Sequence, residues 1–426
     1  MAETCLLHGR TAPATFSLYI RPDARRPWIM SAGTSAVLDL LDDFRFGPHQ
    51  IDYLASDAVG LDDQALDWLS DLELTGEVRT VADGTVVLGD EPLLEFTGPL
   101  PEAMLLETAI MAVAGFPTLI ATKAARCRIV AGGANLADFG ARRAHGLEAG
   151  LEAARAASIG GVGATSNVEA GRRFGIPVVG TMAHSFIQAY EDETQAFADF
   201  ATDHPDNAIM LVDTYDTLDG VRNAVRVGRR LREHGHELDG VRLDSGDLKE
   251  LSKASRELLD DAGFTHAQIF ASGGMDEHKI HRLLEADAPI DAFGIGTALT
   301  TSRDHPAFDI VYKLVEYDGS PRAKYSEGKV LLPGAKQVFR RGGPDTDVLG
   351  RRDEALPGEQ LLQPVWRDGQ RLTDADLSTV REHAQAQLRQ LPAGWRHPDG
   401  PDEPPRPRVS STLSQLAQQL RARDLG

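Results

Sequence analysis

One histidine and several carboxylates follow short apolar runs in the middle of the chain. His184 lies in GTMAHSF, Asp213 and Asp216 lie in LVDTYDT, and Asp244 lies in VRLDSGDL. A histidine titrates near neutral pH and can serve as acid, base or nucleophile, although one at a helix start is more often structural. Carboxylates beside a diphosphate organise Mg2+ or stabilise a developing sugar cation, whereas Asp216 is well placed to cap a helix. We therefore take His184, Asp213 and Asp244 as candidate catalytic residues, and the two aspartates as candidate Mg2+ ligands.

Two glycine-rich turns follow the last two apolar runs of this region. They are SGG at 272–274 and GIGT at 294–297. Such turns present backbone N–H groups to an anion and bind phosphate without a lysine. In α/β barrels a phosphate often lies at the last two strands. The candidate phosphate-binding residues are Ser272, Gly273, Gly274, Gly294, Gly296 and Thr297.

Arginines stand at two further run ends. Arg142 and Arg143 follow DFG, where a single arginine would normally be a solvated surface charge but a tandem pair can clamp phosphate or carboxylate oxygens. Arg242 lies within VRLDSGDL, where we expect it to point inward, and a buried arginine requires an anion. Arg142 and Arg242 are therefore candidates for binding an anionic substrate.

These residues share one position in a repeating pattern. From about 135 to 300, seven short apolar runs alternate with amphipathic stretches such as HGLEAGLEAARAA and DLKELSKASRELLDDAG. Strand, helix and strand at this spacing predict parallel pairing, in a barrel or an open doubly wound sheet. The polar residues fall where a strand ends and a helix begins, and these loops converge on one face of a barrel. Loops are polar in any protein, but that alone does not explain the repeated Asp, Arg and His.

The remaining sequence predicts a second domain. A chain of 426 residues exceeds what one core usually organises. Residues 1–101 and 302–390 have β-like texture and are predicted to form one β-rich domain, while 102–301 form the α/β barrel. Residues 391–426 read as a proline-rich tail with a short terminal helix capped by Ser410 or Ser411.

Composition excludes several classes of function. The chain has 64 acidic and 44 basic side chains, a net charge of −20, which argues against a nucleic-acid or anionic-membrane surface. Its two cysteines, Cys5 and Cys127, are too few for a disulfide framework or a four-thiolate zinc site. The start MAETCLLHGR shows no secretory signal, and no run reaches ~18 uninterrupted apolar residues. We expect a cytoplasmic enzyme.

Taken together and in order, the motifs resemble those of the nicotinate phosphoribosyltransferase family. The likeness extends from about Phe16 to Gln337. It rests on DFGARRAHG, GATSN, GTMAHSF, LVDTYDT, VRLDSGDL, ASGGMDE and FGIGTALTTSRD, supported by EPLLEFTGP, ATKAAR and PGAKQVFR.

The resemblance implies a type II phosphoribosyltransferase fold: an irregular α/β barrel with a smaller β-rich domain, working as a head-to-tail homodimer. It implies that nicotinate and phosphoribosyl pyrophosphate give nicotinate mononucleotide and pyrophosphate, coupled to ATP hydrolysis, so the enzyme combines glycosyltransferase chemistry with a ligase classification in NAD biosynthesis. By motif, His184 is the histidine that ATP phosphorylates transiently. Phe139 stacks on the pyridine ring, and Asp213 and Asp244 lie near ribose and Mg2+.

The resemblance also assigns the anion contacts. Arg142 and Arg242 would face the anionic groups of the substrates, and the four glycines of the two turns would hold the 5′-phosphate. Ser166 in GATSN occupies the place where nicotinamide-using relatives carry an acidic residue, and a serine can donate to a carboxylate that an acid would repel. Ser166 is alternatively a helix cap. Family members normally begin with a segment like TDLYxLTM, whose aromatic covers the base, and MAET aligns with the end of that segment.

Three other functions stay open at this point. The first is nicotinamide or quinolinate phosphoribosyltransferase activity, which Ser166 and the GTMAHS histidine disfavour. The second is a catalytically silent relative that binds pyridine nucleotide, against which His184, Asp213 and Asp244 argue. The third is an unrelated phosphate-binding barrel such as an aldolase, which would need a lysine at a strand end, and the motif loops carry none.

Overall fold

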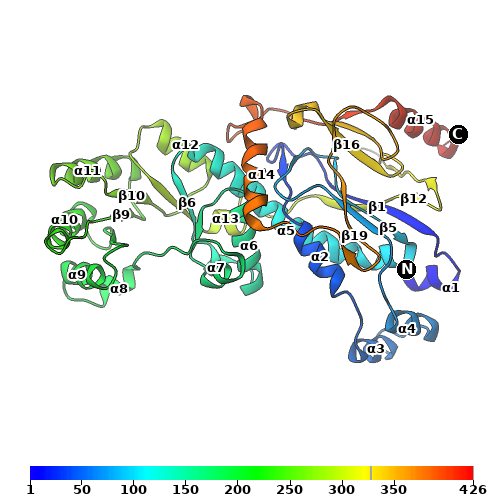
Figure 1. The fold of residues 1–426 in the computed structure, drawn as a ribbon, viewed down its shortest axis with the longest axis horizontal. Helices are drawn as coiled ribbons and strands as arrows, with labels where there is room; N and C mark the ends of the chain where they lie inside the picture. The colour runs from blue at the N-terminus through cyan, green and yellow to red at the C-terminus, as the bar shows by residue number, and fades with distance from the viewer. Residues whose placement is uncertain (327–328, 426) are drawn as a thin grey trace. The chain divides into compact units, whose positions relative to one another are not determined.

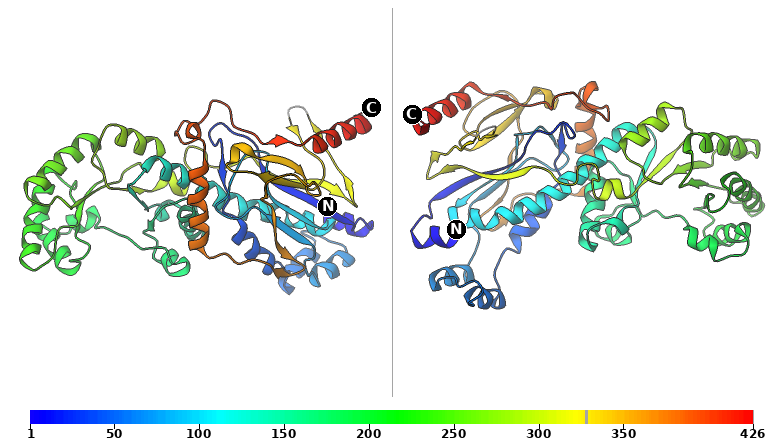
Figure 2. Two further views of the ribbon diagram at one scale, coloured as in Figure 1. Left: turned by 45° about the horizontal axis from the view of Figure 1, so that its top comes forward. Right: turned by 180° about the vertical axis from the view of Figure 1, so that it is seen from behind.

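The computed structural model describes residues 1–326 and 329–425. Residues 327, 328 and 426, which fall in the predicted β-rich segment and terminal helix, lie outside the described residues. The chain divides into two compact units, Met1–Thr122 with Ala307–Gly426, and Lys123–Pro306. The boundary therefore falls inside one helix, α5 (Leu100–Ala131), and not at 101/102, and the proline-rich segment belongs to the first unit. Both labelled chain ends lie in this first unit (Figure 2).

The first unit is built on mainly antiparallel sheets that join distant parts of the chain, with one parallel pair between β17 and β21. Its seven-stranded sheet has the order β13-β12-β1-β5-β3-β19-β20, and a four-stranded sheet has the order β18-β16-β17-β21. β1 lies between β12 and β5 and is antiparallel to both, so the C-terminal segment completes a sheet begun at the N-terminus. The strands are β1 (Pro13–Ile20), β2 (Ile29–Met30), β3 (Glu77–Thr80), β4 (Val86–Val87), β5 (Pro92–Pro99), β12 (Ile310–Tyr317), β13 (Ser320–Pro321), β14 (Tyr325–Ser326), β15 (Lys329–Val330), β16 (Lys336–Arg340), β17 (Val348–Arg351), β18 (Glu359–Gln360), β19 (Gln363–Arg367), β20 (Gln370–Arg371) and β21 (Arg408–Val409).

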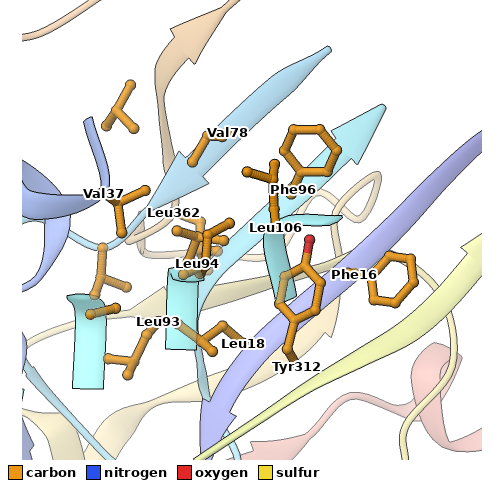
Figure 3. Close-up of a cluster of buried hydrophobic side chains, with 14 of the residues drawn as sticks. Phe16, Leu18, Val37, Val78, Leu93, Leu94, Phe96, Leu106, Tyr312 and Leu362 are labelled. Atoms are coloured by element: carbon orange, nitrogen blue, oxygen red, sulfur yellow. The ribbon is translucent and has the colours of Figure 1, made fainter. Parts of the chain in front are cut away.

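An apolar core holds this unit together. Phe16 of β1 stacks on Tyr312 of β12 with ring centroids 4.8 Å apart, and both side chains are buried. Leu94 and Leu106 pack into the same cluster, which Figure 3 shows between the strands and α5. Each such burial stabilises the fold by roughly 1.5–3 kcal/mol. The other helices of the unit are α1 (Ala2–Leu7), α2 (Thr34–Asp42), α3 (Pro48–Ala55), α4 (Asp63–Ser70), α14 (Leu377–Gln390) and α15 (Ser411–Leu425), with 3-10 turns at Pro344–Thr346 and Ala393–Trp395.

The second unit contains a six-stranded sheet that is parallel throughout, with the order β7-β6-β11-β10-β9-β8. Its strands are β6 (Asn135–Asp138), β7 (Ala164–Thr165), β8 (Ile209–Leu211), β9 (Gly240–Leu243), β10 (Gln268–Ala271) and β11 (Ala292–Ile295). Six of the seven predicted runs thus form strands, which confirms the α/β class. The seventh, IPVVGTMAHS, contributes only a single parallel bridge from Val178 to Thr165, so β7 and β8 remain the edges of the sheet.

Helices follow the strands as predicted and pack against them. Figure 1 shows α10 and α11 beside β9 and β10, and both helices contact β9. Asp216 caps α10 by accepting a hydrogen bond from Asp219 N at 2.9 Å, which confirms its structural alternative. The helices are α6 (Leu147–Ile159), α7 (Val168–Phe174), α8 (His184–Gln188), α9 (Glu193–Asp203), α10 (Thr217–Glu233), α11 (Leu248–Asp261), α12 (Glu277–Glu285) and α13 (Thr297–Thr300), with a 3-10 turn at Ala141–Arg143.

Helix α5 is the one helix, in the part of the chain that the structure describes, long and apolar enough to cross a membrane by length and composition. Half of its apolar window is packed inside the fold. Near its end, Lys123 and Arg126 are buried and form ion pairs with the buried Glu277 of α12. These features are those of a core helix.

Candidate active site

Arg242, the third residue of β9, is the centre of a polar network at the carboxyl edge of the parallel sheet. Its guanidinium donates to Ser272 Oγ at 2.8 Å, to Thr181 Oγ1 at 2.7 Å and to Asp244 Oδ1 at 2.8 Å. The side chain is only 16% exposed, and it does find the anion that its burial requires. That anion is the protein's own carboxylate, so Arg242 acts on Asp244 directly.

The two aspartates of the network are linked to each other. Asp213 Oδ2 accepts hydrogen bonds from Asp244 N at 3.0 Å and from Ser245 Oγ at 2.6 Å. Burial opposes ionisation of Asp244, but hydrogen bonds from Ser272 and Arg242 and the charges of Arg242 and His184 outweigh it and lower the pKa of its carboxyl group. Asp244 is therefore a carboxylate at neutral pH.

The fit of this pair to Mg2+ rests on an unpartnered oxygen. Asp213 Oδ1 is buried and accepts no hydrogen bond from any described residue. No group of three or more His, Cys, Asp and Glu side chains that could hold a metal occurs among the described residues. Mg2+ is usually held by one or two carboxylates together with substrate phosphates and water, so Asp213 and Asp244 fit such a site.

His184 stands at the first position of α8 and belongs to the same cluster. Its Nδ1 lies 3.0 Å from Thr214 Oγ1, and Thr214 directly follows Asp213. The charge of His184 also contributes to the low pKa of Asp244. His184 thus contacts the residue next to Asp213, and a direct role beside Asp213 and Asp244 remains a prediction. Nε2 makes no hydrogen bond within the described residues, which leaves it free to react.

The Gly273–Gly274 turn lies against Asp244. Gly273 has φ +84° and Gly274 has φ +66°, a left-handed pair that favours glycine. A Cβ on Gly273 would lie 1.9 Å from the Asp244 carbonyl oxygen, whereas one on Gly274 would meet nothing within 4 Å. Ser272 also hydrogen-bonds the Asp244 carboxylate. This turn thus joins the network on one side and is open on the other, as an anion site requires.

The second glycine pair requires a correction. Gly294 lies inside β11 and not in a turn, and a Cβ there would press on the rings of Phe139 and Phe270 at 2.7 and 2.9 Å. The missing side chain makes room for these rings, and a phosphate contact of Gly294 remains a prediction. Gly296 and Thr297 do stand at the strand end, where Gly296 precedes the four-residue helix α13.

Phe139 is positioned by that glycine and by a buried aspartate. Its ring stacks on Phe270 with centroids 5.5 Å apart, and the Arg242 guanidinium carbon lies 5.3 Å from its centroid. Asp138 accepts from Gly140 N at 2.8 Å and Thr165 Oγ1 at 2.9 Å, which ties the ends of β6 and β7 together. Burial raises the pKa of Asp138, although these hydrogen bonds counteract it.

Arg142 and Ser166 follow β6 and β7 but are not drawn into the network. Both are exposed, and neither side chain makes a hydrogen bond or ion pair with a described residue. Arg143 is exposed as well. Asn167, and not Ser166, caps α7 by accepting from Ala170 N at 3.2 Å, so the capping alternative for Ser166 is wrong. The Ser166 hydroxyl is free for a ligand.

Three polar residues of the site are not among the predicted site residues, although Thr181 and Thr214 lie within GTMAHSF and LVDTYDT. Thr181 and Thr214 are recognisable only through their contacts with Arg242 and His184. Lys279 Nζ donates to the Gly273 carbonyl at 2.7 Å by reaching back from the first turn of α12. From the sequence, a lysine three residues after the capping Asp276 is expected to be a surface charge. The contact of its ammonium with Gly273 is seen only in the structure.

Fold and site together define an α/β transferase domain for a phosphorylated substrate, joined to a β-rich domain. The model of the nicotinate phosphoribosyltransferase (NAPRTase) N-terminal domain matches residues 1–114, and that of the nicotinate phosphoribosyltransferase (NAPRTase) family matches residues 134–330. The chain belongs to the nicotinate phosphoribosyltransferase family and is an enzyme of this type.

Individual relatives agree with that assignment. The chain is 43% identical over 405 residues to nicotinate phosphoribosyltransferase pncB2 of Mycobacterium tuberculosis, covering 93% of this chain and 86% of the relative. It is 44% identical over 382 residues to nicotinate phosphoribosyltransferase of Bacillus subtilis, covering 85% and 76%. The crystal structure of human nicotinic acid phosphoribosyltransferase superposes with a TM-score of 0.86 at 27% identity over 99% of this chain and 98% of the human one.

Proposed function

We propose that the protein converts nicotinate and phosphoribosyl pyrophosphate into nicotinate mononucleotide and pyrophosphate in the cytoplasm, with ATP as co-substrate and Mg2+ as cofactor. The observation that carries the proposal is the single cluster of Arg242, Asp244, Asp213, His184 and the Gly273–Gly274 turn at one sheet edge. Family membership supports nicotinate and phosphoribosyl pyrophosphate as substrates. The unpartnered atoms of the cluster support ATP as co-substrate and Mg2+ as cofactor.

The carboxylates handle the sugar diphosphate. Asp213 and Asp244 would hold Mg2+, which neutralises diphosphate oxygens and so helps pyrophosphate to leave. Asp244 is kept ionised by Arg242 and Ser272, and a fixed negative charge stabilises the oxocarbenium character that develops at the anomeric carbon. The bond from the anomeric carbon to pyrophosphate breaks, and the pyridine nitrogen supplies the electron pair of the new bond.

His184 couples ATP to this transfer. Nε2 would attack the γ-phosphorus of ATP, forming an N–P bond as ADP leaves with the electron pair of the broken P–O bond. The phosphate adds about 1.5 to 2 negative charges near Asp213 and Asp244 and strengthens Mg2+ binding there. Water later cleaves the N–P bond and releases inorganic phosphate, which resets the site.

Selection of the acid over the amide rests on residues at the base end. Ser166 has an exposed hydroxyl with no partner in the described chain, and Arg142 is an exposed cation beyond the end of β6. A hydroxyl donor and a guanidinium favour the nicotinate carboxylate. Neither is a carboxylate, the strong acceptor that an acidic residue at this place would offer to the nicotinamide NH2 group.

A homodimer is part of the proposal. The β-rich unit contains a cavity of about 510 Å3 lined by basic side chains, among them Arg21, Lys313, Lys324 and Arg406. Five of its thirteen lining residues are Arg or Lys and one is Asp, although the whole chain carries a net charge of −20. In a head-to-tail dimer, this basic cavity would face the second copy of the chain, which is acidic overall. Sedimentation equilibrium should therefore give twice the 46.1 kDa chain mass.

One assay tests the reaction. Purified protein with radiolabelled nicotinate, phosphoribosyl pyrophosphate and Mg2+, with or without ATP, should form labelled mononucleotide, and ATP should stimulate it. His184→Ala should lose the stimulation but retain slow transfer, whereas His266→Ala, which alters an exposed histidine, should behave as wild type. Undiminished stimulation in His184→Ala would remove the phosphohistidine from the mechanism, and failure of the wild type to form mononucleotide would reject the function.

A further inference from the structure

The start of α12 is poorly suited to hold a phosphate by its backbone alone. Asp276 caps the helix, and its carboxylate accepts from Lys279 N at 2.8 Å. The cap uses one of the free N–H groups of the first turn and places a negative charge at the positive end of the helix. An anion bound at the Gly273–Gly274 turn would therefore bind more strongly with another positive group nearby.

Lys279 supplies such a group. Its ammonium donates to the Gly273 carbonyl at 2.7 Å, so the side chain folds over the turn and does not extend into solvent. The residue is partly buried, and no ion pair joins it to a carboxylate anywhere in the described residues. An ammonium has three N–H donors, and one of them is used on Gly273. Two donors remain for a ligand at the turn.

The electrostatic surroundings point the same way. Burial lowers the pKa of Lys279, and the nearby carboxylates of Asp276 and Asp244 counteract this effect. The hydrogen bond to Gly273, whose backbone lies against Asp244 of the network, places the ammonium at the edge of the site. The open side of the Gly274 position leaves room for an anion there.

We propose that Lys279 binds the 5′-phosphate of the nucleotide at the Gly273–Gly274 turn, through the two ammonium donors that its bond to the Gly273 carbonyl leaves free. This inference rests on the proposed function, because that function provides the phosphorylated sugar. Lys279 is a binding residue in this scheme and takes no part in bond breaking.

The experiment compares two ligands that differ only in the phosphate. Nicotinate mononucleotide and nicotinate riboside are titrated by calorimetry into wild type, Lys279→Met, Lys279→Arg and the control Lys253→Met, which removes an α11 lysine with no ion pair in the described chain. Lys279→Met should weaken mononucleotide binding by roughly 10- to 100-fold, the range for a hydrogen bond to a charged group. Riboside binding should change less than about twofold, and Lys279→Arg and Lys253→Met should bind both ligands nearly as wild type does.

Equal weakening of both ligands, or no weakening of either, would overturn the proposal, since both indicate a structural lysine. Failure of the proposed function shows itself separately, as wild type that forms no mononucleotide. If Lys279→Met does not fold, acetylation of Lys279 in wild type decides the matter. Mononucleotide should protect the lysine and riboside should not, whereas equal reactivity with both ligands would overturn the proposal.

Discussion

Substitution of Gly273 by alanine is the sharpest perturbation of the site that the structure suggests. The added methyl group would lie 1.9 Å from the Asp244 carbonyl oxygen. A Cβ atom essentially never approaches another heavy atom of this kind within 3.0 Å. The turn and the end of β9 must therefore separate by about 1.1 Å. The methyl group is fixed to the backbone of residue 273 and the oxygen belongs to the backbone of Asp244, so no side-chain rotation relieves the clash.

The size of the effect follows from that displacement. A shift of about 1 Å at a reacting centre costs on the order of 100-fold in rate, and 100-fold corresponds to about 2.7 kcal/mol of transition-state stabilisation. The left-handed backbone at φ +84° adds about 1–2 kcal/mol of strain to the folded state. We expect kcat/KM to fall about 100-fold and thermal stability to decrease slightly.

A matched control separates the effect of the displaced turn on activity from the effect of backbone strain on stability. Gly235, in the turn after α10, has φ +85° and nothing within 4 Å of its Cβ position. Gly235→Ala should show the same strain in a thermal unfolding assay and keep wild-type kcat/KM for mononucleotide formation. If both variants lose activity equally, or if Gly273→Ala retains it, the close approach to Asp244 does not control the site.

Three further substitutions test separate parts of the scheme. Ser166→Asp should raise KM for nicotinate at least tenfold in steady-state assays, because a carboxylate repels the substrate, and an unchanged KM would contradict its place at the base end. Arg242→Lys should raise the pKa of Asp244 and move the acid limb of the pH–rate profile upward, since Lys lacks the guanidinium fork; an unmoved limb would refute the link. Burial and the nearby Asp347 raise the pKa of the buried Glu91 well above its ordinary value, so its contribution to stability is complete below about pH 4.5 and is lost as pH rises through the raised pKa. Glu91→Gln should remove this loss of stability at higher pH, so its unfolding midpoint should depend less on pH than that of wild type. Parallel curves of unfolding midpoint against pH for the two proteins would contradict the raised pKa of Glu91.

The sequence predicts most of the second unit because its pattern is local. Apolar runs of four to eight residues followed by polar clusters indicate buried parallel strands, and aspartates and an asparagine after them cap the next helices. The run from Ile176 fails for a local reason as well. Pro177 donates no ladder hydrogen bond, and although Ile176 is buried, Val178 and Val179 are exposed, so the stretch pairs through a single bridge only.

What sequence reasoning misses depends on contacts between distant residues. Gly294 has the neighbours expected of a phosphate turn, but its lack of a side chain serves the Phe139 ring, which comes from another strand. Lys279 lies outside every strand end, and its ammonium reaches the turn only because the side chain folds back. The sequence shows that a residue is a glycine or a lysine, but its role depends on which distant residues the fold brings into contact with it.

The distribution of satisfied and unsatisfied groups carries the final argument about how the site works. Arg242 is held by three partners, so it is preorganised and has little to offer a ligand beyond its charge. Within the described residues, no partner is found for Asp213 Oδ1, His184 Nε2 or the side chains of Ser166 and Arg142. A buried polar atom such as Asp213 Oδ1 usually has a partner, which a ligand, an ion or water can supply. We therefore expect Asp213 Oδ1 and His184 Nε2 to meet metal and phosphate, and Ser166 and Arg142 to meet the carboxylate of the proposed substrate.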